Sequence, residues 1–216
     1  MDFMSYVAES MPYLLDGLAF SAKLFAVVVL VGFPLSIVFA ILKSFGPRWL
    51  KAILNVYTWF FRGSPLLLQL SLAYFGLPVV GIVLPTNVVV FSIFILSATA
   101  YETEVVRGGL ISIDKGQYEA CEALGIGKFK TMLRIVVPQT IRKVLPPSCS
   151  EAIILFKDTS LVTAVAEFDL LRAAKNLVIS DARVDAFVIA LFFYLLISSI
   201  LVIVFEVMEK RLLAKS

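Results

Sequence analysis

Long apolar stretches separated by short charged ones make up most of this chain. About 20 consecutive apolar residues are enough to cross the hydrocarbon core of a bilayer as a helix. Five such stretches predict membrane spans, at about 17–42, 54–75, 86–106, 135–165 and 186–205. The pattern therefore predicts an all-α membrane protein with about five transmembrane helices, in which residues 1–216 form a single domain.

The fourth stretch is the least regular of the five. Its apolar character is interrupted by Pro138, by Pro146–Pro147, by Glu151 and by Lys157–Asp158. Each proline removes a backbone donor and clashes with the preceding turn. Non-helical backbone at membrane depth is tolerated only beside protein or a water-filled cavity. We therefore expect a broken fourth span that lines a cavity; the alternative is a cytoplasmic loop followed by one short span.

Basic residues cluster on one side of the predicted spans, and their positions predict the orientation of the chain. The other side has an acidic N-terminus and an uncharged loop at about 78–85. Since Lys and Arg accumulate in cytoplasmic loops, we expect the N-terminus outside and the C-terminus in the cytoplasm. The basic residues are Lys43, Arg48 and Lys51 after the first span, seven between Arg107 and Lys143, and Lys210, Arg211 and Lys215 in the tail.

Composition narrows the possible functions further. The chain is 60% hydrophobic and 16% charged, with a mean hydropathy of +0.96, whereas soluble proteins have about 25% charged residues. The net charge of +3 and the lack of a basic stripe argue against a nucleic-acid partner. Histidine is absent, which excludes histidine-dependent triads and most zinc sites. The sequence has no Walker-type glycine-rich loop, so any ATP-driven process needs another chain.

One polar, helix-prone segment lies between the apolar stretches on the predicted cytoplasmic side. Asp114 or Gln117 can cap its start, and Glu119 and Glu122 lie in its first turns, where the helix dipole favours acidic residues. Gly125 can end it. A membrane protein that keeps a short amphipathic helix outside the bilayer typically presents it to a soluble partner, which is the role we expect here.

This segment resembles the EAA loop of bacterial ABC importer permeases. The family pattern is Glu-Ala-Ala, three residues, Gly, nine residues, Ile, one residue and Leu-Pro. This chain has Glu119-Ala120-Cys121, then Gly125, Ile135 and Val137-Pro138, and departs from the pattern at Cys121 and Val137. The resemblance implies a coupling helix in a loop at about 115–135. Glu119, Ala120, Glu122 and Gly125 would then dock on an ATPase subunit.

Other segments are similar to polar amino acid permeases of the histidine, glutamine and cystine type. These are RGSPLLLQL at 62–70, Tyr101 to Ile113, Pro138 to Pro147, and LFKDTSL at 155–161; the likeness covers about 17–212. It implies a type I ABC importer fold and a subunit that moves a polar amino acid across the bacterial inner membrane. The subunit would be no enzyme and would hold no cofactor itself.

The same resemblance implies a set of partners. Two copies of an ABC ATPase would bind ATP and Mg²⁺ and hydrolyse ATP. A second permease subunit, identical or related, would complete the path through the lipid bilayer, and an external or periplasmic binding protein would deliver the amino acid.

Several polar side chains within the apolar stretches are candidates for binding the substrate. A charge within a span costs about 2.5 to 3.5 kcal/mol on insertion scales, and such residues are functional candidates by default. Glu151 follows the proline pair and would accept an ammonium group; the alternative is a structural ion pair with a neighbouring span. Glu104, Glu102 and Gln69 are further candidates. Glu104 fits the family pattern and Glu102 departs from it. Arg62 is expected to act as a gate by pairing with one of these acids, unless it only extends to the membrane surface.

A self-sufficient secondary transporter or channel is the competing hypothesis, with Glu151 and Asp158 as a proton relay. The EAA-like loop argues against it. So does the absence of a visible internal repeat, because many secondary transporters are built from two homologous halves.

Overall fold

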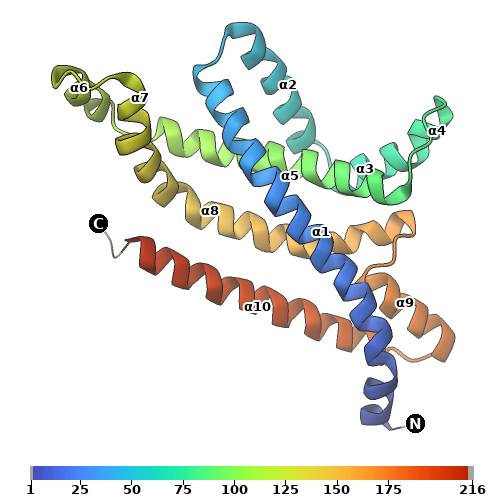
Figure 1. Ribbon diagram of the computed structural model, residues 1–216. Helices are drawn as coiled ribbons and strands as arrows, with labels where there is room; N and C mark the ends of the chain where they lie inside the picture. The colour runs from blue at the N-terminus through green and yellow to red at the C-terminus, as the bar shows by residue number, and fades with distance from the viewer. Residues whose placement is uncertain (1, 214–216) are drawn as a thin grey trace.

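The computed structural model describes residues 2–213, and within them all regular structure is helical. Helices α1, α5, α8 and α10 form the body of the molecule, and the short helices α6 and α7 project from it at one end (Figure 1). The C-terminal end of α10 lies toward this end, while the N-terminus and α9 lie toward the other. The predicted tail residue Lys215 is outside the described residues.

Helix α1 (Phe3–Phe45) begins well before the span predicted at about 17–42. Asp2 caps it, accepting a hydrogen bond from the backbone N–H of Phe3 at 2.7 Å. The charged residues Glu9 and Asp16 lie within this first part. Gly17 is buried where α1 meets the start of α9 (Leu170–Asp181), and a Cβ there would lie 2.6 Å from the carbonyl oxygen of Asp169. The close approach of these two helices therefore requires glycine.

The predicted second span, 54–75, is not one helix. Helix α2 (Arg48–Gly63) ends at Ser64, and after Pro65 the chain continues as α3 (Leu66–Ser71), the π-helix η1 (Leu72–Gly76) and α4 (Leu77–Val79). The physical reason is Pro65, because a residue that precedes proline is pushed from helical to extended backbone. Ser64 accordingly has φ −122° and ψ 147°.

Helix α5 (Thr86–Ile111) is the central element of the fold. It follows a turn that contains Gly81 at φ +86°, a conformation that favours glycine. It packs along α1 and against α2 and α8. A buried cluster between α1, α3, α5 and η3 includes Leu24, Leu70, Phe94 and Val162.

The predicted break of the fourth span at Pro146–Pro147 is wrong. Helix α8 (Val137–Asp158) runs through both prolines. Proline fixes φ near −65°, close to the helical value, and the packing of α8 against α5 and α10 stabilises the helix despite the lost hydrogen bonds. The irregular backbone lies on either side instead. A π-helix, η2 (Met132–Val136), lies between α7 (Lys128–Thr131) and the start of α8, where Pro138 is the second residue. The 3₁₀-helix η3 (Thr159–Val165) follows α8.

Helix α10 (Asp185–Leu213) completes the fold and packs against α8 and α9. Among the described residues, three helices are long and apolar enough to cross a membrane: α1, α5 and α10 over Asp185–Arg211. Many of their large apolar side chains are exposed, as expected for surfaces that face lipid. The expected total of about five spans stays a prediction.

Candidate functional site

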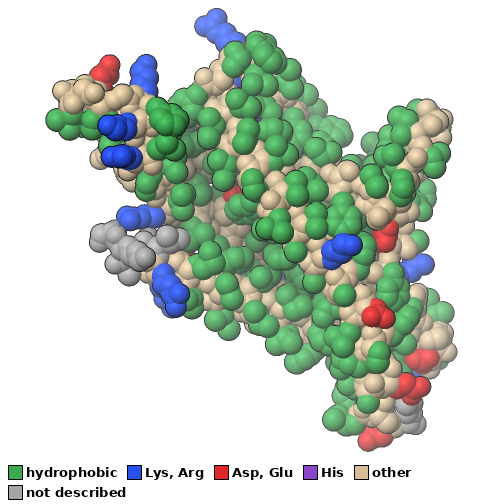
Figure 2. Space-filling view, in the orientation of Figure 1, with side chains coloured by type: hydrophobic (Ala, Val, Ile, Leu, Met, Phe, Trp, Pro, Cys, Tyr) green, Lys and Arg blue, Asp and Glu red, His purple; other side chains and the backbone are tan. Residues whose placement is uncertain are grey.

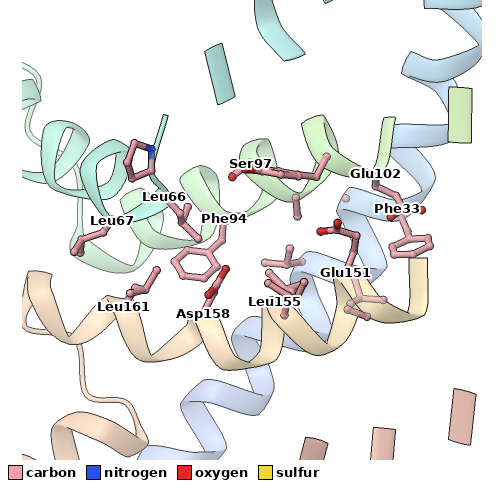
Figure 3. A pocket seen from close by; sticks show the side chains of 18 of the residues that line it. Phe33, Leu66, Leu67, Phe94, Ser97, Glu102, Glu151, Leu155, Asp158 and Leu161 are labelled. Atoms are coloured by element: carbon pink, nitrogen blue, oxygen red, sulfur yellow. The ribbon is translucent and has the colours of Figure 1, made fainter. Parts of the chain in front are cut away.

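A cavity of about 390 Å³ lies between α1, α3, α5 and α8. Figure 3 shows side chains of α5 facing those of α8 across it, with Leu66 and Leu67 of α3 nearby. Much of its wall is apolar, including Val28, Phe33, Leu66, Phe94, Leu155 and Leu161. A cavity with mostly apolar walls and a few polar groups is the usual form of a small-molecule site.

Three carboxylates line this cavity: Glu102 from α5, and Glu151 and Asp158 from α8. Glu151 and Asp158 are seven residues apart, which places them on the same face of α8, about 10 Å apart along the helix axis. No lysine or arginine is among the described lining residues. The cavity is therefore suited to groups that carry positive charge.

Glu151 and Glu102 are predicted from the sequence as substrate ligands, whereas Asp158 is predicted there only as part of a proton relay. The i, i+7 spacing from Glu151 was the signal that joins the two residues in one site. Within residues 2–213, Glu151 makes no ion pair within 4 Å, so the structural ion pair that was its alternative role is not present there.

Glu102 lies at one end of the cavity, near Glu151 (Figure 3). It is only 3% exposed. The hydroxyl of Ser148, on α8, donates a hydrogen bond to its Oε1, while its Oε2 has no hydrogen-bond partner among the described residues. Glu102 also lines a second, apolar cavity of about 260 Å³ between α1, α5 and α8, and Ser148 lines this second cavity as well. Glu102 thus lies between an acidic cavity and an apolar one.

Glu104 lies outside the lining of either cavity, in a cluster of charged residues. Lys43 of α1 donates a hydrogen bond to its Oε1, and Nε of Arg107 donates one to its Oε2 at 2.9 Å. The Nη2 atom of Arg107 forms an ion pair with the same oxygen at 2.7 Å. Nη1 of Arg62 is 4.0 Å from the same oxygen. Lys43 also donates to the hydroxyl of Thr58 on α2 at 2.6 Å. The cluster joins α1, α2 and α5.

Arg62 lies at the edge of the acidic cavity. Its guanidinium carbon is 5.7 Å from the centre of the ring of Tyr101, which lines the cavity. The hydroxyl of Tyr101 donates to the carbonyl oxygen of Arg62 at 3.3 Å. Arg62 is thus between the Glu104 cluster and the cavity, a position from which it can contact either.

Gln69 is buried beneath the junction of α2 and α3 and does not line the cavity. Its Nε2 donates to the carbonyl oxygens of Phe61 and Ser64 at 2.8 and 2.9 Å, and it is 3.0 Å from the hydroxyl oxygen of Ser64. It therefore satisfies carbonyl groups that the end of α2 leaves unpaired. Ser64, Pro65 and Leu66 line the cavity, so Gln69 supports one of its walls.

The predicted cytoplasmic helix is present as α6 (Lys115–Ala123), and both predicted end signals are confirmed. The carboxylate of Asp114 accepts a hydrogen bond from the N–H of Gly116 at 2.6 Å. Gly125 has φ +69° and donates to the carbonyl of Glu122, while Ile126 donates to the carbonyl of Cys121. This pair of bonds is a Schellman motif, which glycine at the left-handed position allows.

Helix α6 is held by a few side chains and is otherwise exposed. Tyr118 and Met132 pack on a buried cluster of α1, α5 and η2 that includes Ala40 and Val106, and burial raises the pKa of the Tyr118 phenol. Glu119, Ala120, Glu122 and Gly125 are all exposed. So are Leu124 (76%) and Phe129 (78%). An anchored helix with exposed charged and apolar side chains has the features of a docking surface.

The chain is similar to known transport proteins over most of its length. Residues 32–214 match the family described as binding-protein-dependent transport system inner membrane component. The arginine transport system permease protein ArtQ of Bacillus subtilis is 32% identical over 98% of this chain and 97% of its own length. A putative glutamine transport system permease protein, GlnP of Rickettsia prowazekii, is 37% identical over 76% of this chain and 75% of its own length.

Solved structures agree with these sequence relatives. The crystal structure of an amino acid ABC transporter with histidines matches with a TM-score of 0.90 and 28% identity, over 98% of this chain and 99% of that one. An inward-facing structure of the methionine transporter MetNI, at 14% identity and a TM-score of 0.70, shares the fold. The expected all-α, type I ABC importer fold is thus confirmed. The chain belongs to the binding-protein-dependent transport system inner membrane components, the permease subunits of ABC importers.

Proposed function

We propose that this protein carries a polar amino acid across the bacterial inner membrane and that the acidic cavity is the site through which the substrate passes. The observation that carries the proposal is that Glu151 and Asp158 lie on one face of α8 in a cavity whose described lining includes no lysine or arginine. Relatives are named as arginine, cystine and putative glutamine permeases. An ammonium group is common to all these substrates, and a carboxylate binds it with a charge-assisted hydrogen bond.

In this proposal α6 transmits the conformational change of a separate ATPase to the membrane helices. Two ATPase subunits hold ATP and Mg²⁺, and each docks one coupling helix through the surface that includes Glu119, Ala120, Glu122 and Gly125. This chain has no cofactor of its own. A second permease subunit, identical or related, encloses the path with it, and a binding protein delivers the amino acid from outside. Closure of the ATPase dimer moves the helices as rigid bodies between inward- and outward-facing states.

Arg62 acts as a gate in this scheme. Nη1 of Arg62 is 4.0 Å from Oε2 of Glu104, and the guanidinium lies next to the ring of Tyr101 on the cavity wall. The positive charge of Arg62 is also close enough to Glu151 to attract its carboxylate. When the substrate leaves, Arg62 moves toward the vacated carboxylates and balances their charge, since isolated charges at this depth are costly.

The test is ATP-driven uptake by the complete transporter in proteoliposomes. The wild-type permease should copurify with a P-loop ATPase. The complex should accumulate an amino acid only when ATP is present on the side of the membrane where the ATPase lies. Glu151→Gln keeps the shape of the side chain and removes its charge. A hydrogen bond to a charged group is worth about 1.5 to 3 kcal/mol, so the apparent substrate affinity should fall roughly tenfold or more.

The exposed Glu206 of α10 provides the matched control, because Glu206→Gln makes the same chemical change away from the cavity. Unchanged rate and concentration dependence in Glu151→Gln would mean that Glu151 does not contact the substrate. Uptake without an ATPase would favour a secondary transporter instead.

The proposed orientation has the N-terminus outside and the C-terminus in the cytoplasm. Basic side chains gather toward the end of the molecule with α6 and α7, and acidic ones toward the N-terminal end of α1 (Figure 2). Because basic ends stay in the cytoplasm, we predict that a cysteine introduced by Lys128→Cys resists external membrane-impermeant thiol reagents. A cysteine introduced by Val79→Cys should react.

Both residues suit this measurement, which is made in sealed cells and in a background without Cys121 and Cys149. Lys128 is exposed at the start of α7, and Val79 is 85% exposed beside the turn before α5. Labelling of the Lys128→Cys variant from outside would reverse the orientation. Permeabilised cells provide the control, since both sites should then react.

A further inference from the structure

The acidic cavity has more negative charge than its own surroundings balance. Glu102, Glu151 and Asp158 line it. Two of the nearby basic residues, Lys43 and Arg107, are paired with Glu104 instead. Arg62, at the cavity edge, provides one positive charge close to Glu151. A neutral amino acid brings one ammonium group but also its own carboxylate, so it adds no net positive charge and the excess of negative charge in the cavity remains.

The positions of the three carboxylates suggest what the missing charge is. Figure 3 shows Glu102 and Glu151 at one end of the cavity and Asp158 toward the other. The two turns of α8 between Glu151 and Asp158 separate these ends by about 10 Å. A ligand that reaches both ends needs cationic groups at both of its ends. An amino acid with a long cationic side chain has this form, with an α-ammonium at one end and an amine or guanidinium at the other.

One carboxylate oxygen of Glu102 accepts a hydrogen bond within the protein, and the other is available to accept one from a ligand. Ser148 donates to Oε1, and Oε2 is buried without a partner in residues 2–213. A buried acceptor that lacks a partner costs free energy that a bound donor would recover. Glu151 is close enough to Glu102 for the two charges to repel, and a cation between them would relieve that repulsion.

We infer that Glu102 selects for amino acids with a cationic side chain, by binding that side chain together with Glu151 while Asp158 binds the α-ammonium. Ser148 is a positioning residue, since it fixes Glu102 so that Oε2 remains available for the ligand. The inference rests on the proposed function, and it assigns a substrate class to the same cavity.

The experiment is direct binding of radiolabelled arginine and glutamine to the purified complex of permease and ATPase, without the external binding protein. Omitting that protein removes its own selectivity from the measurement. The wild-type complex should bind arginine more tightly than glutamine. Glu102→Gln should weaken arginine binding roughly tenfold or more and change glutamine binding by less than threefold, so that the preference falls.

Two further variants distinguish the effect of the Glu102 charge from effects on its position or on folding. Glu102→Asp keeps the charge, so it should retain a preference for arginine even where its affinity is lower. Ser148→Ala should reduce that preference in the same direction as Glu102→Gln, but by a smaller factor. The exposed Glu206→Gln variant should bind both amino acids as the wild type does.

The outcomes distinguish this inference from the function on which it rests. A complex that assembles and hydrolyses ATP in response to binding protein, but has the same arginine preference with and without Glu102, overturns the inference and leaves the importer function intact. Equal loss of both amino acids in Glu102→Gln, with equal loss in Glu102→Asp, assigns Glu102 a structural role and also overturns it. Failure of the wild-type chain to assemble with an ATPase would contradict the proposed function itself.

Discussion

Gly125→Pro should abolish transport while the protein remains in the membrane. Gly125 has φ +69°, whereas proline is held near −65°. The substitution also removes the N–H that donates to the carbonyl of Glu122 at 3.0 Å. Both changes disrupt the Schellman motif at the end of α6. The helix should then no longer end at Gly125, and its orientation relative to the rest of the protein should change. Because α6 has few contacts with the body, the membrane helices should fold as before.

The measurement compares ATP-driven uptake with ATP hydrolysis in proteoliposomes that contain equal amounts of permease. Uptake should fall to the background level for Gly125→Pro. Gly127→Pro is the matched control, because Gly127 has φ −60° and no atom of the described residues lies within 4 Å of an added Cβ. It should retain most of the transport activity.

A charge reversal at Glu119 separates docking from folding. Glu119 is exposed on α6, and its side chain makes no hydrogen bond or ion pair within the described part of the chain. Glu119→Lys should therefore leave the fold unchanged but weaken contact with the ATPase. Less ATPase should copurify, and transport should fall. Wild-type uptake in both Glu119→Lys and Gly125→Pro would contradict the role proposed for α6.

Local signals in the sequence predicted the ends of α6 well, because each end depends on residues close to it in the chain. Asp114 caps the helix two residues before its bonding partner, and the N–H of Gly125 donates to the carbonyl three residues before it. Pro65, by contrast, was present as a signal for the break between α2 and α3, but the continuous apolar stretch around it suggested one span. Apolarity shows where a chain can be buried, and the backbone rules at proline determine where a helix ends.

At Pro146–Pro147 the error is the opposite one, because a break was predicted where the helix continues. The loss of two backbone donors predicted the break, but contacts with neighbouring helices stabilise α8 through this region. Ser148, directly after the prolines, bonds to Glu102 of α5, and α10 packs along α8. Such packing depends on residues far away in the sequence, so a rule based on local hydrogen bonds did not find it.

Some of the site residues could likewise be identified from local sequence, whereas others depend on packing between distant segments. Helical spacing places Glu151 and Asp158 on one face from sequence alone, and both line the cavity. Glu104 is only two residues from Glu102, yet Glu102 faces the cavity and Glu104 faces Lys43, which is 61 residues away in the sequence. Which of two neighbouring acids faces a cavity depends on the helices packed around them, which the sequence pattern did not identify.

Because Glu104 forms ion pairs with Lys43 and Arg107, Glu104→Gln should strongly destabilise the protein. The side chains of Lys43 and Glu104 are only 9% and 12% exposed. Removal of one partner leaves the other charge buried without compensation, which typically costs 3 to 5 kcal/mol. Arg107, at 2.7 Å from the same carboxylate, loses its partner as well.

Thermal unfolding of the solubilised protein measures this effect, with a dye that reacts with Cys121 and Cys149 as they become exposed. One kcal/mol shifts the melting temperature by about 2 to 4 °C in chains of this size, so a loss of 3 kcal/mol predicts a decrease of roughly 6 to 12 °C. The double variant Lys43→Met with Glu104→Gln should recover part of the loss, because it also removes the unpaired lysine charge.

The matched control is Glu206→Gln, which breaks an exposed pair with Lys210 at 3.9 Å. Exposed pairs contribute about 0 to 1 kcal/mol, so its melting temperature should change little. Similar melting temperatures for the two glutamine variants would contradict the structural role of Glu104. If Glu104→Gln instead reduced substrate affinity at unchanged stability, Glu104 would be a substrate ligand, as the sequence alone had suggested. The charged cluster would then be part of the transport path, because Arg62 already connects it to the cavity wall at Tyr101.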